Sequence, residues 1–301
     1  MRRVVMAAIA LSLGMSGCSG SEQQVAGDRL VVATSTIVED IVRNIGGDEL
    51  RLVSLIPNGF DSHTYEPKPS EIEMLEQADL VILADAGLNQ KITQLAQLAA
   101  GEERLLDLNA TALEASDFIN KPGSSRGNPH TWTDPNLVAK WVPVIAATLV
   151  ERGLALKTTV ETNAREYLAE LTKLDNLIRT RLDKVAKEQR RLVVYHDAWE
   201  YFARQYDLDL VGVLQAVDFA EPSAGEVEDL VREIRDLQVK VFFGSEVFPS
   251  DVLETLERES GARYVSDLAD DQLIGKPGDT GYGYVPLMEQ NLELLDQGLR
   301  S

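Results

Sequence analysis

Short apolar runs alternate with helical patterns along the first half of the chain. Residues 30–33, 52–56, 80–83 and 104–108 are rich in Leu, Ile and Val, and helical spacing of apolar positions follows most of them. Continuous apolar runs of four or five residues, separated by amphipathic segments, are typical of parallel α/β units. We therefore expect residues 28–156 to form one N-terminal α/β lobe.

A longer helical pattern follows without a break. Residues 157–190 contain no Pro or Gly, and apolar side chains recur at helical spacing: Tyr167, Leu171, Leu174, Ile178, Leu182 and Val185. At ~1.5 Å per residue, one helix of this length would span about 50 Å. We predict a single linking helix that runs along both halves of the molecule as a stiff spine.

The alternation then resumes, with apolar runs at 192–195, 210–214 and 239–243 and helical patterns between them. Residues 191–301 are therefore expected to form a second α/β lobe. The predicted fold class is α/β, with two lobes built on parallel sheets and joined by the long helix. Ligands of open α/β sheets bind beyond the carboxyl ends of the strands, so the cleft between the lobes is the expected site.

The first residues have the pattern of a secretory signal. Arg2 and Arg3 precede an apolar run over 4–15, and small residues lie directly before Cys18. The run is shorter than the roughly 20 residues that a membrane-spanning helix needs. Cys18 is the only cysteine, at the position where bacterial lipoproteins carry the acylated residue. We expect a signal peptide over 1–17, a lipidated tether over 18–27, and an extracytoplasmic protein anchored to a bacterial membrane, on the periplasmic side or the cell surface.

The charge balance narrows the class of partner. The chain has 29 basic and 49 acidic residues, a formal net charge of −20 at pH 7. Such a charge makes nucleic acid an improbable partner and is compatible with a soluble monomer.

The three histidines carry the chemistry that the sequence offers. His63, His130 and His196 each lie in a loop-like or strand-end setting, and none is on the apolar face of a helix. A single such histidine is most often a capping or hydrogen-bonding residue. Three of them after strands of the two lobes favour a shared metal site, since imidazole suits zinc, copper, iron and nickel. Zinc commonly completes its shell with a carboxylate, which we expect from the second lobe.

The segments around these histidines resemble the solute-binding lipoproteins of zinc and manganese ABC importers. The similar motifs are Ser-His-Thr-Tyr-Glu-Pro-Lys-Pro-Ser at His63, Asn-Pro-His-Thr-Trp-Thr-Asp-Pro at His130 and Tyr-His-Asp-Ala-Trp-Glu-Tyr-Phe at His196. The resemblance implies one ligand from each of four loops, two per lobe, the fourth being a carboxylate in a late glycine-containing loop. That position matches Asp279, with Asp270 and Asp271 as neighbouring competitors; Asp279 is also compatible with an Asx-turn between glycines.

The resemblance also implies a function and partners. The function is capture of a divalent metal ion outside the cytoplasm and delivery to the permease of an ABC importer. Manganese binders of this kind have Glu in place of the third histidine, so His196 favours Zn²⁺ as cargo. Many zinc-type relatives carry a His-rich loop in the first lobe, whereas residues 118–128 contain no histidine, which keeps manganese or iron open.

Two functions of other classes are compatible with parts of the sequence. A zinc metallohydrolase would use a similar ligand set, but the chain has no His-Glu-x-x-His motif, and four protein ligands would leave no position for an activated water. A surface adhesin would share the lipid anchor. We expect a binding protein, not an enzyme, whose stiff linking helix permits small tilts of the lobes and no wide closure.

Overall fold

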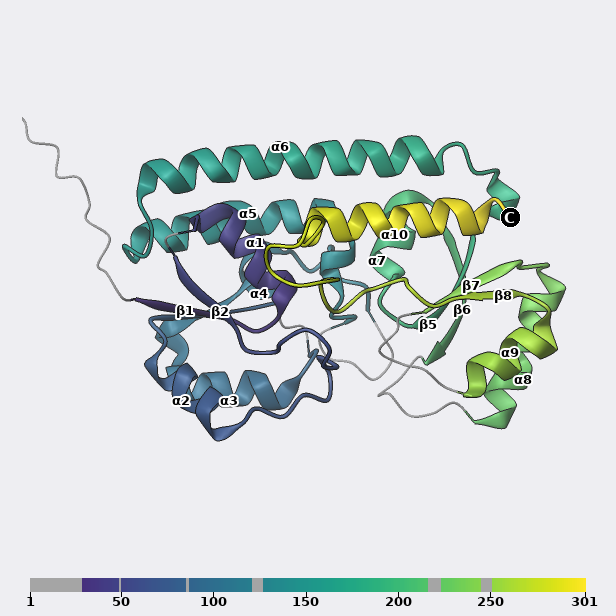
Figure 1. Cartoon of the computed structure of the whole chain (residues 1–301), viewed down its shortest axis with the longest axis horizontal. Helices are drawn as coiled ribbons and strands as arrows, with labels where there is room; N and C mark the ends of the chain where they lie inside the picture. Colours follow the sequence, from purple (N-terminus) through teal and green to yellow (C-terminus); the bar gives the residue numbers. More distant parts are fainter. Residues whose placement is uncertain (1–28, 49, 85–86, 121–126, 216–222, 245–250) are drawn as a thin grey trace, which may run out of the picture.

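The computed structural model describes residues 29–48, 50–84, 87–120, 127–215, 223–244 and 251–301. Two α/β lobes lie side by side, and one long helix runs along both of them (Figure 1). The predicted fold class is confirmed. The expected signal peptide, the tether and Cys18 fall outside the described residues.

The first sheet has four parallel strands in the order β2-β1-β3-β4. They are β1 (Leu30–Ala33), β2 (Arg51–Ser54), β3 (Leu80–Leu83) and β4 (Leu105–Asp107). All residues of β1 and β3 are buried, because helices cover both faces of this sheet.

The helices of this lobe divide between the two faces of the sheet. The lobe contains α1 (Thr36–Gly46), α2 (Pro69–Gln77), α3 (Gln90–Ala100), η1 (Glu102–Arg104), α4 (Leu108–Ala112), η2 (Thr131–Thr133) and α5 (Pro135–Glu151). Val31 and Ala33 pack with α1 and α5, whereas Leu30 and Val32 pack with α2 and α3. Successive side chains of a strand point to opposite faces of the sheet, so the apolar residues of β1 alternate between two hydrophobic cores.

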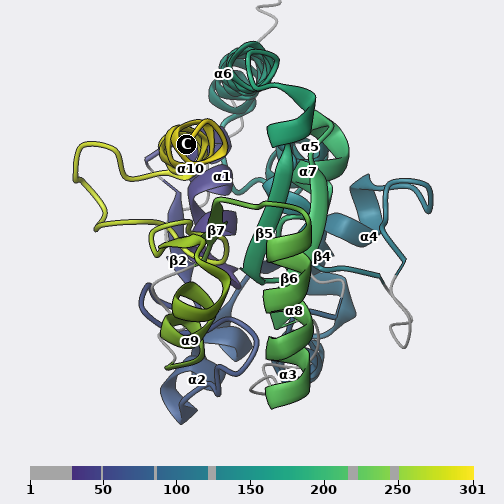
Figure 2. The same cartoon turned by 90° about the vertical axis from the view of Figure 1, so that its right-hand side faces the viewer.

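The second sheet repeats this order as β6-β5-β7-β8, again all parallel. Its elements are η3 (Lys187–Gln189), β5 (Arg191–His196), α7 (Glu200–Tyr206), β6 (Asp209–Gln215), α8 (Ala224–Asp236), β7 (Val241–Phe243), α9 (Asp251–Ser260), β8 (Arg263–Val265) and α10 (Tyr284–Leu299). Helices α7 and α10 lie on one side of the sheet and α8 and α9 on the other (Figure 2).

The linking helix is α6 (Lys157–Leu182), eight residues shorter than predicted. It ends where Asp183 caps the last turn through its backbone, and Ala186 is extended. The predicted helix was too long at its C-terminal end because Val185 is buried in the same core without being helical. Helix α6 packs against α1 and α5 of the first lobe and α10 of the second.

One continuous apolar core joins the lobes on the side of α6. It contains residues of α1 and α5, the inner face of α6, and residues of α7, α10 and β5. Opening the lobes widely would expose part of this core to water, which is unfavourable by about 25 cal/mol per Å². Among the described residues, no helix combines the length and apolarity needed to cross a membrane.

Candidate metal centre

The three histidines meet between the two sheets. His63 lies in the loop between β2 and α2, His130 directly precedes η2, and His196 is the last residue of β5. Their ring centroids are 5.1 Å apart for His63 and His130, 5.1 Å for His63 and His196, and 4.6 Å for His130 and His196. Asp271, in the loop after β8, completes a group whose ligand atoms all lie within 4.8 Å of one another.

The spacing of these atoms suits a single ion. The Nε2 atoms of His63 and His130 are 3.1 Å apart, and Asp271 places its oxygens 3.3 Å from the former and 3.6 Å from the latter. Four ligands at tetrahedral angles, with bonds of about 2.0–2.1 Å, lie about 3.3 Å from one another. The donor set of three imidazoles and one carboxylate therefore fits a divalent transition metal.

Asp271 has a buried carboxylate whose oxygens are available to bind a metal ion. Neither oxygen has a hydrogen bond of acceptable geometry from any described residue. Burial acts to raise its pKa, yet contact with His63 and the charges of the three imidazoles hold the pKa of Asp271 well below its usual range. A buried anion is stabilised by nearby positive charge, and a divalent ion at the histidines would supply it when the imidazoles are neutral ligands.

His196 is oriented by the neighbouring carboxylate. Its Nδ1 lies 3.2 Å from Oδ2 of Asp270, which directs Nε2 toward the other two histidines. Burial alone would lower the pKa of His196, but the charge and hydrogen bond of Asp270 raise it above its ordinary value. Burial also raises the pKa of Asp270. Such an outer carboxylate fixes the ring and strengthens it as a ligand.

His130 is oriented by an amide. Its Nδ1 is 2.7 Å from Oδ1 of Asn128, so the ring N–H donates to the amide oxygen and Nε2 faces the site. The amide nitrogen of Asn128 donates to the Asp197 carbonyl at 2.8 Å and to Glu200 at 3.1 Å. The side chain of Asn128 therefore connects His130 of the first lobe to the segment that follows His196 in the second lobe.

Local turns present the two first-lobe histidines. Asp61 accepts from the backbone N–H of His63 at 2.9 Å and from the Thr64 hydroxyl at 2.6 Å, which closes the turn around His63. After His130 the chain makes the η2 turn, and Asp134 then caps α5 through the Asn136 N–H. Short polar residues before and after each histidine create these turns.

Comparison with known proteins decides the family. The family model described as ZnuA, zinc-uptake complex component A, periplasmic, matches residues 31–298. The chain belongs to the ZnuA family. It is an extracytoplasmic metal-binding component of an ABC importer, whose partners are a permease and an ATPase, and it is not an enzyme. The metallohydrolase alternative is thereby excluded.

Individual relatives of this ZnuA family chain carry the names of different metals. It is 27% identical over 300 residues to the manganese-binding lipoprotein MntA of Halalkalibacterium halodurans, covering 98% of this chain and 96% of the relative. It is 26% identical over 296 residues to the iron ABC transporter lipoprotein MtsA of Streptococcus pyogenes, covering 94% and 93%. A solved structure of a ZnuA deletion mutant with zinc bound superposes with a TM-score of 0.77 at 26% identity, covering 90% and 97%.

Asp279 lies outside the metal-site group, contrary to the expectation from sequence. It is exposed in the loop before α10, and its carboxylate accepts from the backbone N–H of Lys276 at 2.9 Å. It therefore helps to close the turn over residues 276–279, in which the Asp279 N–H also donates to the Lys276 carbonyl at 3.0 Å. The structure instead places Asp271 beside the histidines and Asp270 behind His196. The signal in the sequence is the Asp pair that directly follows the buried residues Leu268 and Ala269.

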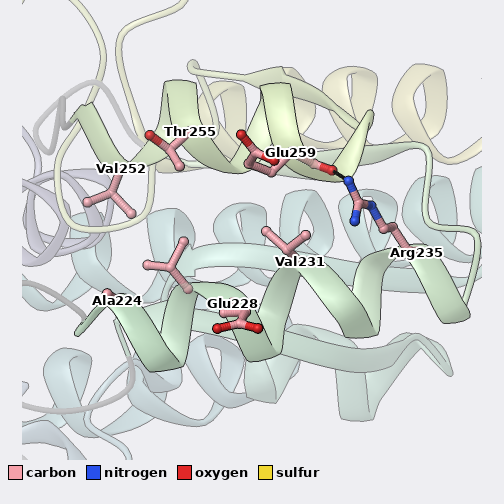
Figure 3. A pocket seen from close by; sticks show the side chains of 8 residues that line it. Ala224, Glu228, Val231, Arg235, Val252, Thr255 and Glu259 are labelled. Carbon is pink, nitrogen blue, oxygen red and sulfur yellow. Dashed lines mark hydrogen bonds between the residues drawn. The ribbon is translucent and has the colours of Figure 1, made fainter.

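A hollow of about 530 Å³ lies away from the metal centre. Figure 3 shows it between α8 and α9, with Val231 of α8 and Val252 of α9 among the side chains that line it from opposite sides. Arg235 donates to the backbone carbonyl of Glu259 at one end. No histidine is among its lining residues in the described chain, so it offers no comparable ligand set.

Proposed function

We propose that this chain captures Zn²⁺ with His63, His130, His196 and Asp271 and delivers it to the permease of its importer. One observation carries the proposal. Three imidazoles converge from both lobes on a buried carboxylate that has no hydrogen-bond donor of acceptable geometry among the described residues. For the fourth ligand, Asp271 takes the place of Asp279.

The donor set favours zinc over manganese. Three imidazole nitrogens and one carboxylate are typical ligands of tetrahedral zinc, and a given site binds zinc more tightly than manganese in the Irving–Williams order. Manganese is the second candidate cargo, because the similar protein MntA is named as manganese-binding. Tight zinc binding alone does not separate the two, so the test compares both affinities and follows how the preference changes with the ligand set.

We also propose that residues 1–17 are removed, that Cys18 carries the lipid anchor, and that 18–27 form the tether of a monomeric protein. The names of the similar proteins MntA and MtsA include the word lipoprotein, which supports the anchor. Labelling with a radioactive fatty acid tests it. Label should enter the intact chain and be absent from Cys18→Ala.

Metal binding in this proposal links the lobes without a wide closure. His63 and His130 belong to the first lobe, and His196 and Asp271 to the second, so one ion bridges them. The shared core along α6 restricts the relative motion to small tilts and loop rearrangements. Separation of the lobes by tens of degrees between metal-free and metal-bound protein would contradict this mode.

The test is calorimetric competition between zinc and manganese on metal-stripped protein, repeated with His196→Glu at the same pH. Matched pH is required because imidazole protonation competes with the metal. Strong zinc preference that shifts toward manganese in the variant supports a zinc importer component. Comparable affinities in the unchanged protein favour the manganese candidate, and no tight binding of either metal overturns the proposal.

A second experiment distinguishes the proposed metal-import function from the adhesin function. Cells that produce His196→Ala are expected to grow poorly under zinc limitation, while the metal-free variant still unfolds cooperatively. Normal growth together with lost adhesion to a host surface would instead support the adhesin function.

A further inference from the structure

The loop that carries Asp271 belongs to the second lobe, yet it is hydrogen-bonded to the first. The bridging loop is defined here as residues 270–275, which follow β8. The carbonyl of Asp270 accepts from Nε1 of Trp132 at 2.7 Å, and Gln272 accepts from the Gly59 N–H through its side chain. Both donors are in the first lobe. One bonds the residue before Asp271 and the other bonds the residue after it.

Thr36 and Asn58 extend these contacts along the bridging loop. The Thr36 hydroxyl donates to Oδ1 of Asn58 at 2.7 Å and accepts from the backbone N–H of Leu273 at 3.4 Å. The amide nitrogen of Asn58 donates to the Gly275 carbonyl at 3.1 Å. The two side chains therefore form one hydrogen-bonded pair that contacts the loop at two points.

This pair is held in place independently of the metal. Thr36 is buried at the first position of α1, where Ser35 already caps the helix, so the threonine hydroxyl is not needed as a cap. Leu273 packs into the core that joins both lobes. The imidazole and carboxylate ligands of the site are His63, His130, His196 and Asp271, and the pair is connected to the last of them through hydrogen bonds to the loop.

We propose that Thr36 and Asn58 are positioning residues that hold the bridging loop against the first lobe and thereby slow the release of the metal. The inference rests on the proposed function of the site. Asp271 is two residues from Leu273, so losing the bonds at Leu273 and Gly275 loosens the loop that carries its carboxylate. A ligand held by a fixed loop rebinds the ion before it escapes, whereas a mobile ligand permits escape.

The proposal predicts an effect on dissociation and little on association. The pair is hydrogen-bonded to backbone groups of the loop, and it carries no charge that would attract an incoming cation. Outer contacts of metal ligands typically change affinity by about 10- to 100-fold, and these contacts are partly exposed, so about tenfold is expected.

Thr36→Val and Thr36→Ser form the matched pair for the test. Valine keeps the shape and loses the hydroxyl, and serine keeps the hydroxyl. Zinc release is measured by stopped flow with excess chelator, and association and metal-free thermal unfolding are measured on the same samples. The prediction is release about tenfold faster in Thr36→Val, release within twofold of the unchanged protein in Thr36→Ser, and association within twofold in both.

Asn58→Ala provides a second variant should Thr36→Val fold poorly, and Asn44→Ala is the control. Asn44 is on the same helix as Thr36, and its side chain is hydrogen-bonded to Asp40 within that helix. Release from Asn58→Ala is expected to be about fivefold faster and release from Asn44→Ala unchanged. Unchanged release in both Thr36→Val and Asn58→Ala overturns the inference, as does an equal effect of Asn44→Ala.

The outcome also separates this inference from the proposed function. An unchanged protein that retains no zinc refutes the proposed function, and the inference with it. An unchanged protein that holds zinc, with variants that release it at the same rate, refutes the positioning role alone.

Discussion

Two consecutive segments between β8 and α10 contain the same kinds of residue and have opposite surroundings. Residues 268–275 begin in the core, and their backbone is hydrogen-bonded to Asn291 of α10 and to Trp132 of the first lobe. Residues 276–283 are mostly exposed, and their turn is closed by bonds within the segment, such as that between Asp279 and the Lys276 N–H.

The difference shows what separates a metal ligand from a turn residue. The carboxylate of Asp279 is satisfied locally, so its position requires no ion. The carboxylate of Asp271 is buried among histidines, and no described residue donates to it with acceptable geometry. Aspartate near glycine is common to both segments, and only the tertiary surroundings distinguish them.

Among the substitutions that test this contrast, replacing Asp271 should have the largest effect. Asp271→Asn keeps the shape and removes the charge that faces the histidines. Zinc affinity, measured by chelator competition, is expected to fall at least about 100-fold, or about 2.7 kcal/mol. The metal-free variant should unfold earlier than the unchanged protein, because the low pKa of Asp271 means that the folded state stabilises its charge through the histidines. An affinity within threefold would show that Asp271 is not a ligand.

Replacing Asn291 tests whether the buried segment depends on its supports. Its amide donates to the Ala269 carbonyl at 2.7 Å and accepts from the Ala269 N–H at 3.1 Å. Asn291→Ala should weaken zinc binding about tenfold, and the two buried groups left without a partner should lower the free energy of unfolding by about 2 kcal/mol. Asn176→Ala, on the exposed face of α6, is the control and should change neither quantity.

The far end of the exposed segment is fixed by Asp40, which accepts from the Tyr284 N–H at 2.8 Å. Burial raises the pKa of Asp40 to about 6, although the bond from Tyr284 acts to lower it. The folded protein thus binds this proton more tightly than the unfolded chain does. Ionised Asp40 is therefore destabilising above pH 6, and the penalty disappears as pH falls toward about 4.

Asp40→Asn should accordingly stabilise the metal-free protein by about 1–2 kcal/mol at pH 8 and leave it unchanged at pH 4. Urea unfolding at the two pH values measures this difference, and zinc affinity should be unaffected. An equal gain at both pH values would mean that the charge of Asp40 is not the cause.

The smallest expected effect is that of Asp279→Asn. Its side chain remains able to accept from the Lys276 N–H, so the turn persists. Zinc affinity and release should stay within twofold of the unchanged protein. A tenfold loss would restore Asp279 as a ligand and reverse the contrast between the two segments.

The sequence was sufficient to predict the elements whose pattern is local. The strands at 30–33 and 80–83 are where their apolar runs predict them, because a buried parallel strand is apolar on both faces. The three histidines come together because each lies in a loop or at a strand end on the side of the cleft. Parallel strands bring such positions to one edge of a sheet.

The features that depend on distant partners could not be predicted in the same way. The choice between Asp271 and Asp279 depends on Trp132 and the histidines, which are far from both in sequence, and on Asn291 of the following helix. The end of α6 was placed too late because Val185 is buried outside the helix. The spacing of apolar residues indicates which side chains are buried, and here a buried side chain follows the end of the helix.

The central claim is that one ion is held by three histidines and Asp271. Anomalous diffraction at the zinc absorption edge, from crystals of zinc-loaded protein, tests it most directly. The account predicts one strong peak within bonding distance of His63, His130, His196 and Asp271, with Asp279 exposed and away from it. A peak bonded to Asp279 with Asp271 withdrawn, or one remote from the histidines, would contradict the account.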